Sequence, residues 1–149
     1  MRKFVIFVYL IIALLLSGCA TNLSSRLAPG VTIDDELGKT FVVRFEPDKR
    51  KLNTIIADQL SLMGYPAIAG EEDEIPEDVD TLVTYKDYWK WDITNYMIKI
   101  IIQIRNGKSR GLIVSGESYR TSLVRKSPEK MIKETLEEIF KNKKGSFQN

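Results

Sequence analysis

The chain has 149 residues, a length that fits one domain. Hydrophobic residues make up 44% and charged residues 28%, as in globular proteins and unlike disordered or fibrous chains. The net charge of +2 gives no electrostatic reason to expect a nucleic acid partner. The sequence contains no histidine, which excludes Ser-His-Asp triads, Cys-His dyads and imidazole metal ligands.

The N-terminal segment has the layout of a secretory signal peptide. Arg2 and Lys3 precede an unbroken apolar run over residues 4–16, and small residues end that run. The run is shorter than the ~20 residues that a membrane-spanning helix needs. We predict a lipoprotein signal peptide over residues 1–18, with an uncleaved membrane anchor as the alternative.

The only cysteine of the sequence, Cys19, directly follows Leu16, Ser17 and Gly18. This order resembles the bacterial lipobox, in which the thiol is joined to diacylglycerol and the signal peptide is then removed. A lone cysteine cannot form a disulfide within its own chain, and stable anchoring takes two or more acyl chains, which a lipobox product carries. We predict that Cys19 is the lipid attachment site, and not a free core thiol.

The segment after the cysteine is polar and contains Pro29 and Gly30, with few apolar positions at regular spacing. Residues 19–39 are therefore predicted to form the lipidated cysteine and a flexible tether, with a reach of ~25 Å that holds the domain clear of the headgroups. In the alternative, the segment docks on the domain through its apolar residues, which are Leu27, Val31, Ile33 and Leu37.

The chain then alternates between the hydrophobic periods of strands and helices. Residues 40–46 alternate with a period of two, which predicts a strand with Phe41, Val43 and Phe45 on its core face. Apolar residues at steps of three and four predict a helix over residues 52–63, with Asp48 offering an N-cap. Residues 65–68 are predicted to form a brief edge strand, where proline is tolerated.

Seven acidic residues lie between positions 71 and 80. The alternating ligands, central glycine and closing glutamate of a calcium loop are missing. We predict a solvated acidic loop.

Three strands and a helix complete the chain. Residues 81–91 are rich in strand-forming side chains, and Asn106-Gly107 favours a tight hairpin between strands over residues 96–105 and 112–119. The predicted central strand has one apolar row, formed by Tyr96, Ile98, Ile100, Ile102 and Ile104. Ser127-Pro128 predicts the start of the last helix, and residues 145–149 are predicted to be a disordered tail.

An antiparallel meander with one apolar face must cover that face, and two amphipathic helices are available to do so. We therefore predict an α+β fold, a two-layer sandwich of two helices on a mainly antiparallel sheet of four or five strands. It forms a single domain over residues 40–144.

Five aromatic residues lie between positions 85 and 96 among charged side chains, namely Tyr85, Tyr88, Trp89, Trp91 and Tyr96. Strand alternation sends Tyr85, Trp89 and Trp91 to one face of the sheet. Part of the cluster is therefore predicted to pack on protein. The rest is a candidate partner surface, because exposed aromatic rings stack on ligands and anchor interfaces.

The run from Tyr85 to Asp92, followed by Asn106-Gly107, Gly116 and the helix start at Ser127, resembles small envelope lipoproteins of Gram-negative bacteria. The resemblance covers about residues 40–142. It implies an α/β sandwich like those of the N-terminal domain of the Tol-system translocation protein and of the lipopolysaccharide-assembly lipoprotein. It implies no catalytic residue. Ala20 after the cysteine, by the sorting rule of enteric bacteria, implies the outer membrane.

These features favour a non-enzymatic lipoprotein that is anchored in the outer membrane through the lipid on Cys19. Its domain is expected to face the periplasm and to bind another envelope component, either a protein or a glycolipid, without a cofactor or a metal. Two alternatives remain open. One is an enzyme that acts on envelope polysaccharide through Asp87, Asp92 or Glu117, and the other is a purely structural lipoprotein.

Overall fold

The computed structural model describes residues 21–33 and 37–145, with side chains up to residue 141. Cys19 and the predicted signal peptide lie outside the described residues, as do residues 146–149. The strands are β1 (Thr21–Leu27), β2 (Thr40–Val43), β3 (Ala67–Gly70), β4 (Thr81–Asp92), β5 (Thr94–Asn106) and β6 (Leu112–Arg120). The helices are α2 (Leu52–Leu62), α3 (Pro128–Gly145) and the short 3-10 turns η1 (Glu72–Glu74) and η2 (Ser122–Val124).

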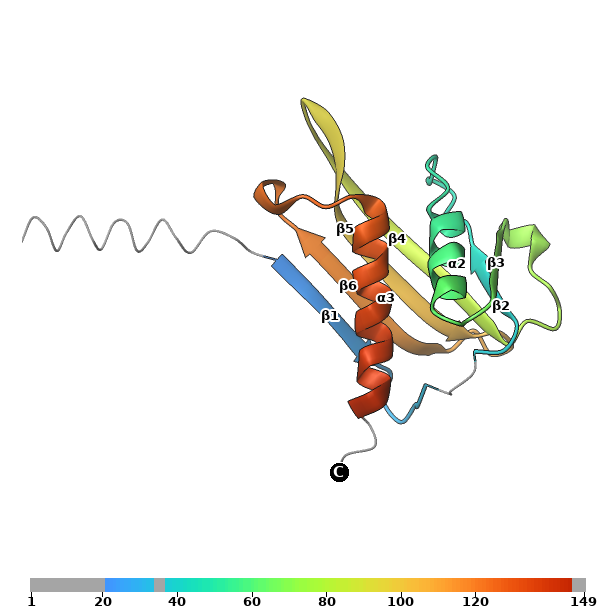
Figure 1. The fold of residues 1–149 in the computed structure, drawn as a ribbon. Helices are drawn as coiled ribbons and strands as arrows, with labels where there is room; N and C mark the ends of the chain where they lie inside the picture. The colour runs from blue at the N-terminus through green and yellow to red at the C-terminus, as the bar shows by residue number, and fades with distance from the viewer. Residues whose placement is uncertain (1–20, 34–36, 146–149) are drawn as a thin grey trace, which may run out of the picture.

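The strands form one sheet in the order β1-β6-β5-β4-β2-β3, and α2 and α3 cover one of its faces (Figure 1). The predicted α+β two-layer sandwich is confirmed, with six strands in place of four or five. The sheet is mixed, because β2 runs parallel to both β3 and β4 while the other pairs are antiparallel. A parallel pair needs a crossover, and α2 supplies it between β2 and β3. No helix in the described part of the chain is long and apolar enough to cross a membrane.

Residues 21–27, predicted as part of a flexible tether, form the edge strand β1. This strand pairs with β6 over its whole length, from Thr21 opposite Arg120 to Leu27 opposite Val114. The Ser25 hydroxyl also donates to the backbone carbonyl of Glu138 in α3 at 3.0 Å. Of the four apolar residues named for docking, Leu27, Ile33 and Leu37 pack against the main core. The tether prediction is therefore wrong for this stretch.

The main core lies between the sheet and the two helices. Its fully buried members are Leu52, Ile56 and Leu60 of α2, Met131, Ile132, Leu136 and Ile139 of α3, and Val42, Val83, Ile100, Ile102, Ile104 and Val114 of the sheet. Each such side chain contributes about 1.5–3 kcal/mol through burial. This apolar layer fixes both helices on the sheet.

The side of β2 that faces the main core differs from the prediction. Val42 faces the helices, while Phe41 and Val43 pack with Val79 and Leu82 in a second, smaller cluster on the other face. The segment between η1 and β4 covers that second cluster, so β2 is buried on both sides. A strand buried on both faces has no polar side that would mark its orientation.

A β-bulge interrupts the apolar row predicted for β5. Trp89 lies opposite Met97 and Tyr88 opposite Lys99, which leaves Ile98 as an extra residue without a partner on β4. Met97 is consequently buried, while Tyr96 and Ile98 are only half-buried. The predicted row is correct from Ile100 onward and wrong before it.

The loop between β5 and β6 is also longer than predicted. Asn106-Gly107 does not form a two-residue turn, and the connection spans residues 107–111. The Asn106 side-chain oxygen accepts hydrogen bonds from the N–H groups of Lys108 and Ser109, at 3.1 and 2.9 Å. A Cβ on Gly107 would lie 2.0 Å from the Val79 carbonyl oxygen, so glycine is required by this close approach.

Helix α3 is fixed to β6 by a partly buried ionic cluster. Glu134 accepts hydrogen bonds at 2.7 Å from Ser118 and from Arg120, and it pairs with Lys126. Burial alone would raise the pKa of the Glu134 carboxyl. The hydrogen bonds from these three residues have the larger combined effect and hold the pKa below its usual value. A depressed pKa means that the ionised carboxylate stabilises the folded state.

We predict that Glu134→Gln lowers the free energy of unfolding at pH 7 by about 1–3 kcal/mol, as expected for lost charge-assisted hydrogen bonds. The stability from ionised Glu134 is present above the unfolded pKa of about 4.3 and is lost as the pH falls through the lower folded value. Denaturant unfolding of both proteins at pH 7 and in acid should therefore show a difference that shrinks in acid. A difference that persists undiminished in acid would contradict this assignment.

Candidate functional site

We call residues 85–96, with their five aromatic side chains, the aromatic segment. Its first aromatic residue, Tyr85, belongs to the core. Tyr85 is buried, and its hydroxyl donates to Asp48 Oδ2 at 2.6 Å and accepts from the Phe45 N–H at 3.3 Å. The same carboxylate oxygen accepts from the N–H of Leu52 at the start of α2, also at 2.6 Å. Burial and the hydrogen bond to Asp48 raise the pKa of the Tyr85 hydroxyl. Tyr85 therefore joins β4 to the N-terminus of α2 and is not available at the surface.

The two tryptophans share a face of β4 but differ in exposure. Trp89 is half-buried against the main core, with the Arg50 guanidinium 3.7 Å from its ring centre. Its indole N–H donates to Asp87. Trp91 is 73% exposed, because the hairpin of β4 and β5 extends beyond the helices (Figure 1).

The remaining two aromatic residues, Tyr88 and Tyr96, have other surroundings. Tyr88 is exposed on the helix-free face, where Lys99 Nζ lies 5.6 Å from its ring centre. Tyr96 is half-buried, and the Arg125 guanidinium lies 3.8 Å from its ring centre. The five aromatic side chains are thus divided between the core, the two faces of the sheet and the end of the hairpin. They do not form one continuous surface.

The three carboxylates considered for catalysis also lie apart. Asp87 is bonded to Trp89 on the helix side of the sheet, while Glu117 pairs with Lys99 at 2.8 Å on the opposite face. Asp92 pairs with Arg125 at the end of the hairpin. Hydrolysis of a glycosidic bond requires two carboxyl groups that flank one bond. This arrangement offers no such pair.

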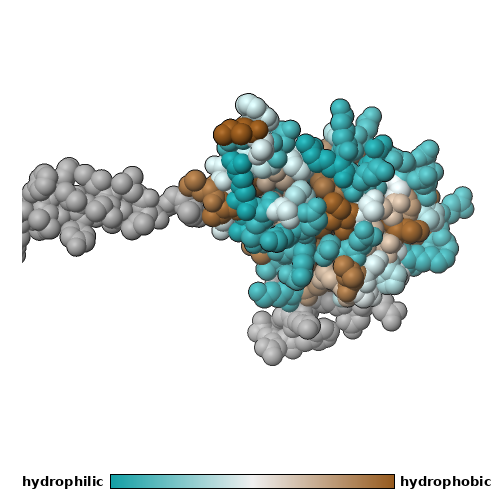
Figure 2. Space-filling view, turned by 45° about the horizontal axis from the view of Figure 1, so that its top comes forward, coloured by the Kyte–Doolittle hydropathy of each residue, from teal (hydrophilic) through white to brown (hydrophobic). Residues whose placement is uncertain are grey.

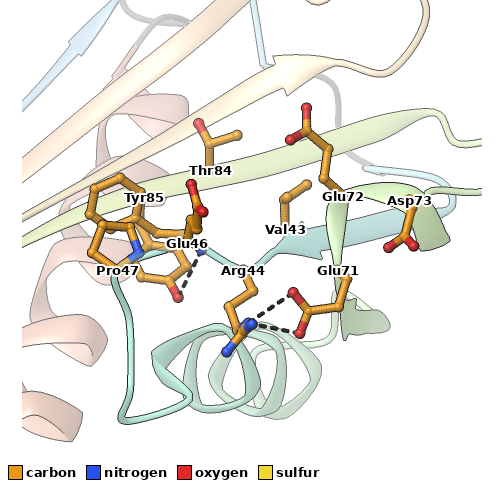
Figure 3. Close-up of a pocket in the computed structure, with 10 residues that line it drawn as sticks. Val43, Arg44, Glu46, Pro47, Glu71, Glu72, Asp73, Thr84 and Tyr85 are labelled. Atoms are coloured by element: carbon orange, nitrogen blue, oxygen red, sulfur yellow. Dashed lines mark hydrogen bonds and ion pairs between the residues drawn. The ribbon is translucent and has the colours of Figure 1, made fainter.

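A pocket of about 870 Å³ opens where β2 ends and β4 continues (Figure 3). Its lining comes from residues 43–47, 71–73 and 84–85. Arg44 Nε pairs with Glu71 at 2.7 Å, and the hydrogen bond and charge of Glu71 raise the pKa of the Arg44 guanidinium. Glu46, Glu72 and Asp73 add further carboxylates to the wall.

The pocket provides polar contacts but no assembled catalytic group. Thr84 is its one hydroxyl besides that of Tyr85, which is bonded to Asp48. Within residues 21–33 and 37–145, no group of three or more acidic or cysteine side chains is arranged to hold a metal ion. Two of the seven acidic residues between positions 71 and 80 form ion pairs, Glu71 with Arg44 and Asp78 with Lys39.

Two arginines that the sequence did not single out shape the surroundings of the aromatic segment. Arg50 covers Trp89, and Arg125 contacts both Tyr96 and Asp92. These partners are separated by about thirty or more residues in the sequence, so no local pattern links them. Only the folded arrangement of the hairpin, η2 and α2 brings them together.

Comparison with known proteins identifies the fold. No family model and no curated protein matches the chain. The PelC dodecamer from Paraburkholderia phytofirmans is similar, with a TM-score of 0.59 and 13% identity over 80% of this chain and 98% of the PelC chain. The chain shares the fold of PelC.

A point variant of the same PelC, also a dodecamer, gives a TM-score of 0.56 and 14% identity. That match covers 78% of this chain and 95% of the PelC chain. At such low identity the similarity to PelC extends to the fold alone. It agrees with the α/β sandwich that the resemblance to envelope lipoproteins implied.

We expect the two tryptophans to respond differently to truncation. Trp89→Ala should lower the free energy of unfolding by about 2–3 kcal/mol, because it leaves a cavity at the edge of the core and removes the ring beneath Arg50. Trp91→Ala removes a mostly exposed side chain and should change stability by no more than about 0.5 kcal/mol. Denaturant unfolding measures both values, and equal losses would contradict these placements.

Proposed function

We propose that the protein is a bacterial lipoprotein, anchored in the outer membrane through a lipid on Cys19. Its domain faces the periplasm and acts as a non-enzymatic binding or assembly module of the cell envelope. The observation that carries this proposal is the lipobox, in which the only thiol of the chain follows Leu16, Ser17 and Gly18.

The separation of the carboxylates supports a non-enzymatic role. Asp87, Asp92 and Glu117 each have a different partner, on different parts of the sheet. An enzyme acting on polysaccharide would need two of them in one concave site. The alternative of an envelope polysaccharide enzyme therefore loses its candidate residues.

The fold supports an assembly role. PelC, which has this fold, forms a dodecamer, so the fold can build large assemblies of identical subunits. We propose that this domain also works through contacts with other envelope components, which are either proteins or glycolipids. A purely structural lipoprotein would have the same anchor but no discrete partner.

The lipid anchor is tested by replacing the thiol. Cys19→Ala is expected to abolish incorporation of radiolabelled palmitate and to leave an uncleaved or soluble precursor, because no other thiol can take up the lipid. Thr21→Ala, two residues further on, is the matched control and should be labelled normally. Normal labelling of Cys19→Ala would contradict the lipobox assignment.

The binding role is tested in intact envelopes. Crosslinking followed by purification of the lipidated protein should recover the same partner, or oligomers of the protein itself, in repeated experiments. Cys19→Ala protein serves as the control, since it should lose partners that depend on membrane attachment. Recovery of no reproducible partner would contradict the binding role and favour a structural one.

A further inference from the structure

The path of β1 places the N-terminal end of the domain at a defined position. Thr21 lies opposite Arg120, the last residue of β6, so β1 begins at the end of the sheet toward which the β4–β5 hairpin projects (Figure 1). Cys19 is two residues earlier in the sequence, and two residues span at most ~7 Å. A lipid on Cys19, on which this inference rests, would therefore hold this end of the domain at the membrane surface.

The same end carries exposed apolar side chains. Ile93 at the turn of the hairpin is 90% exposed, Trp91 is 73% exposed, and Leu123 in η2 is 80% exposed. We call these three residues the apolar tip. Pairing of β5 with β6 begins at Lys99, so residues 94–98 extend the hairpin ~16 Å beyond the first β5–β6 pair. Figure 2 shows hydrophobic patches on the side of the molecule where β1 begins.

Ile93 is unfavourable for the isolated domain in two respects. Its φ of 57° lies in the left-handed region, where a β-branched residue is rare and costs roughly 1–3 kcal/mol. Its side chain is also almost fully exposed to water. Asparagine or glycine would relieve the strain and suit the solvent. An isoleucine at this turn therefore points to an apolar contact outside the domain.

Ionic contacts hold the parts of the apolar tip together. Arg125 pairs with Asp92 beside the turn and stacks on Tyr96, which fixes the segment after η2 to the hairpin. The pair also compensates the negative charge of Asp92. Lys90, exposed on the same hairpin, adds positive charge beside the apolar side chains, whereas Lys126, next to Arg125, is paired with Glu134.

These properties match the interface of a phospholipid bilayer. Tryptophan is favoured at the headgroup level, an aliphatic side chain enters the acyl region, and lysines interact with anionic lipids. We propose that the apolar tip inserts into the membrane that holds the lipid on Cys19. The domain is then attached at two points, the lipid and the hairpin, which fixes its orientation and directs the opposite end of the sheet away from the bilayer.

The insertion is tested by fluorescence quenching in the full-length mature, lipidated protein. The protein is reconstituted into vesicles of phosphatidylethanolamine and phosphatidylglycerol with brominated acyl chains, which quench nearby tryptophan. Trp89→Phe leaves Trp91 as the only tryptophan, and the matched variant Trp91→Phe leaves Trp89. We expect about twofold quenching of Trp91, which lies at the interface, and little quenching of Trp89, which Arg50 covers.

A second substitution separates insertion from folding. Ile93→Asn in the Trp89→Phe protein removes the apolar side chain and relieves the left-handed strain. It is expected to reduce the quenching of Trp91 while the melting temperature stays the same or rises. Unchanged quenching would show that Ile93 does not enter the membrane and would contradict the proposal.

A labelled thiol provides a readout that does not depend on the tryptophan variants. Since a lipid blocks the thiol of Cys19, Leu123→Cys and Leu62→Cys each introduce one reactive thiol for an environment-sensitive dye. Leu62 is 79% exposed at the end of α2, which runs back toward the start of β4 and so lies at the opposite end of the molecule (Figure 1). Only the label at position 123 should respond to the vesicles.

The outcomes distinguish this inference from the proposed function. Mass spectrometry of each sample establishes whether Cys19 carries the lipid. With the lipid present, unquenched Trp91 or equal responses of the two labels would overturn the insertion and leave the anchor intact. A sample without lipid on Cys19 would overturn both proposals.

Discussion

The pairing of β1 with β6 is the constraint on which the relation between the domain and its anchor depends. It begins at Thr21, two residues after Cys19, and continues to Leu27. A flexible tether of twenty residues would have a reach of ~25 Å, whereas two residues span at most ~7 Å. The strand thus converts a loosely tethered domain into one that is held close to its lipid. The apolar tip gains its proposed role from this proximity.

Unequal strand lengths explain why the hairpin carries exposed aromatic side chains. β4 and β5 have 12 and 13 residues, whereas β2 has 4 and β6 has 9. β2 pairs with β4 only as far as Val83, and β6 pairs with β5 only as far as Lys99, so the hairpin beyond Tyr88 and Lys99 pairs only with itself. Among residues 21–33 and 37–145, no helix covers the end of the hairpin. Arg50 and Arg125 cover two of the rings there, and Trp91 and Ile93 remain exposed.

The sequence predicted those parts of the fold that depend on local pattern. The two amphipathic helices, the start of α3 at Ser127-Pro128 and the two-layer arrangement follow from hydrophobic spacing and capping. The orientation of β2 did not follow, because Phe41 and Val42 are both buried and the strand lacks a polar face. β1 was missed because its pairing needs backbone groups and only a few apolar contacts, such as that of Leu27. The bulge at Ile98 and the contacts of Arg125 depend on residues distant in the sequence.

Hydrogen exchange of the backbone amides of residues 21–27 in the membrane-bound, lipidated protein tests the central claim most directly. If β1 is paired with β6 beside the anchor, alternate amides in this segment should exchange much more slowly than those of an unstructured peptide, and at rates similar to their partners in β6. Exchange at the rate of an unstructured peptide throughout residues 21–27 would show that the segment is a free tether. That result would contradict the close attachment of the domain to the membrane.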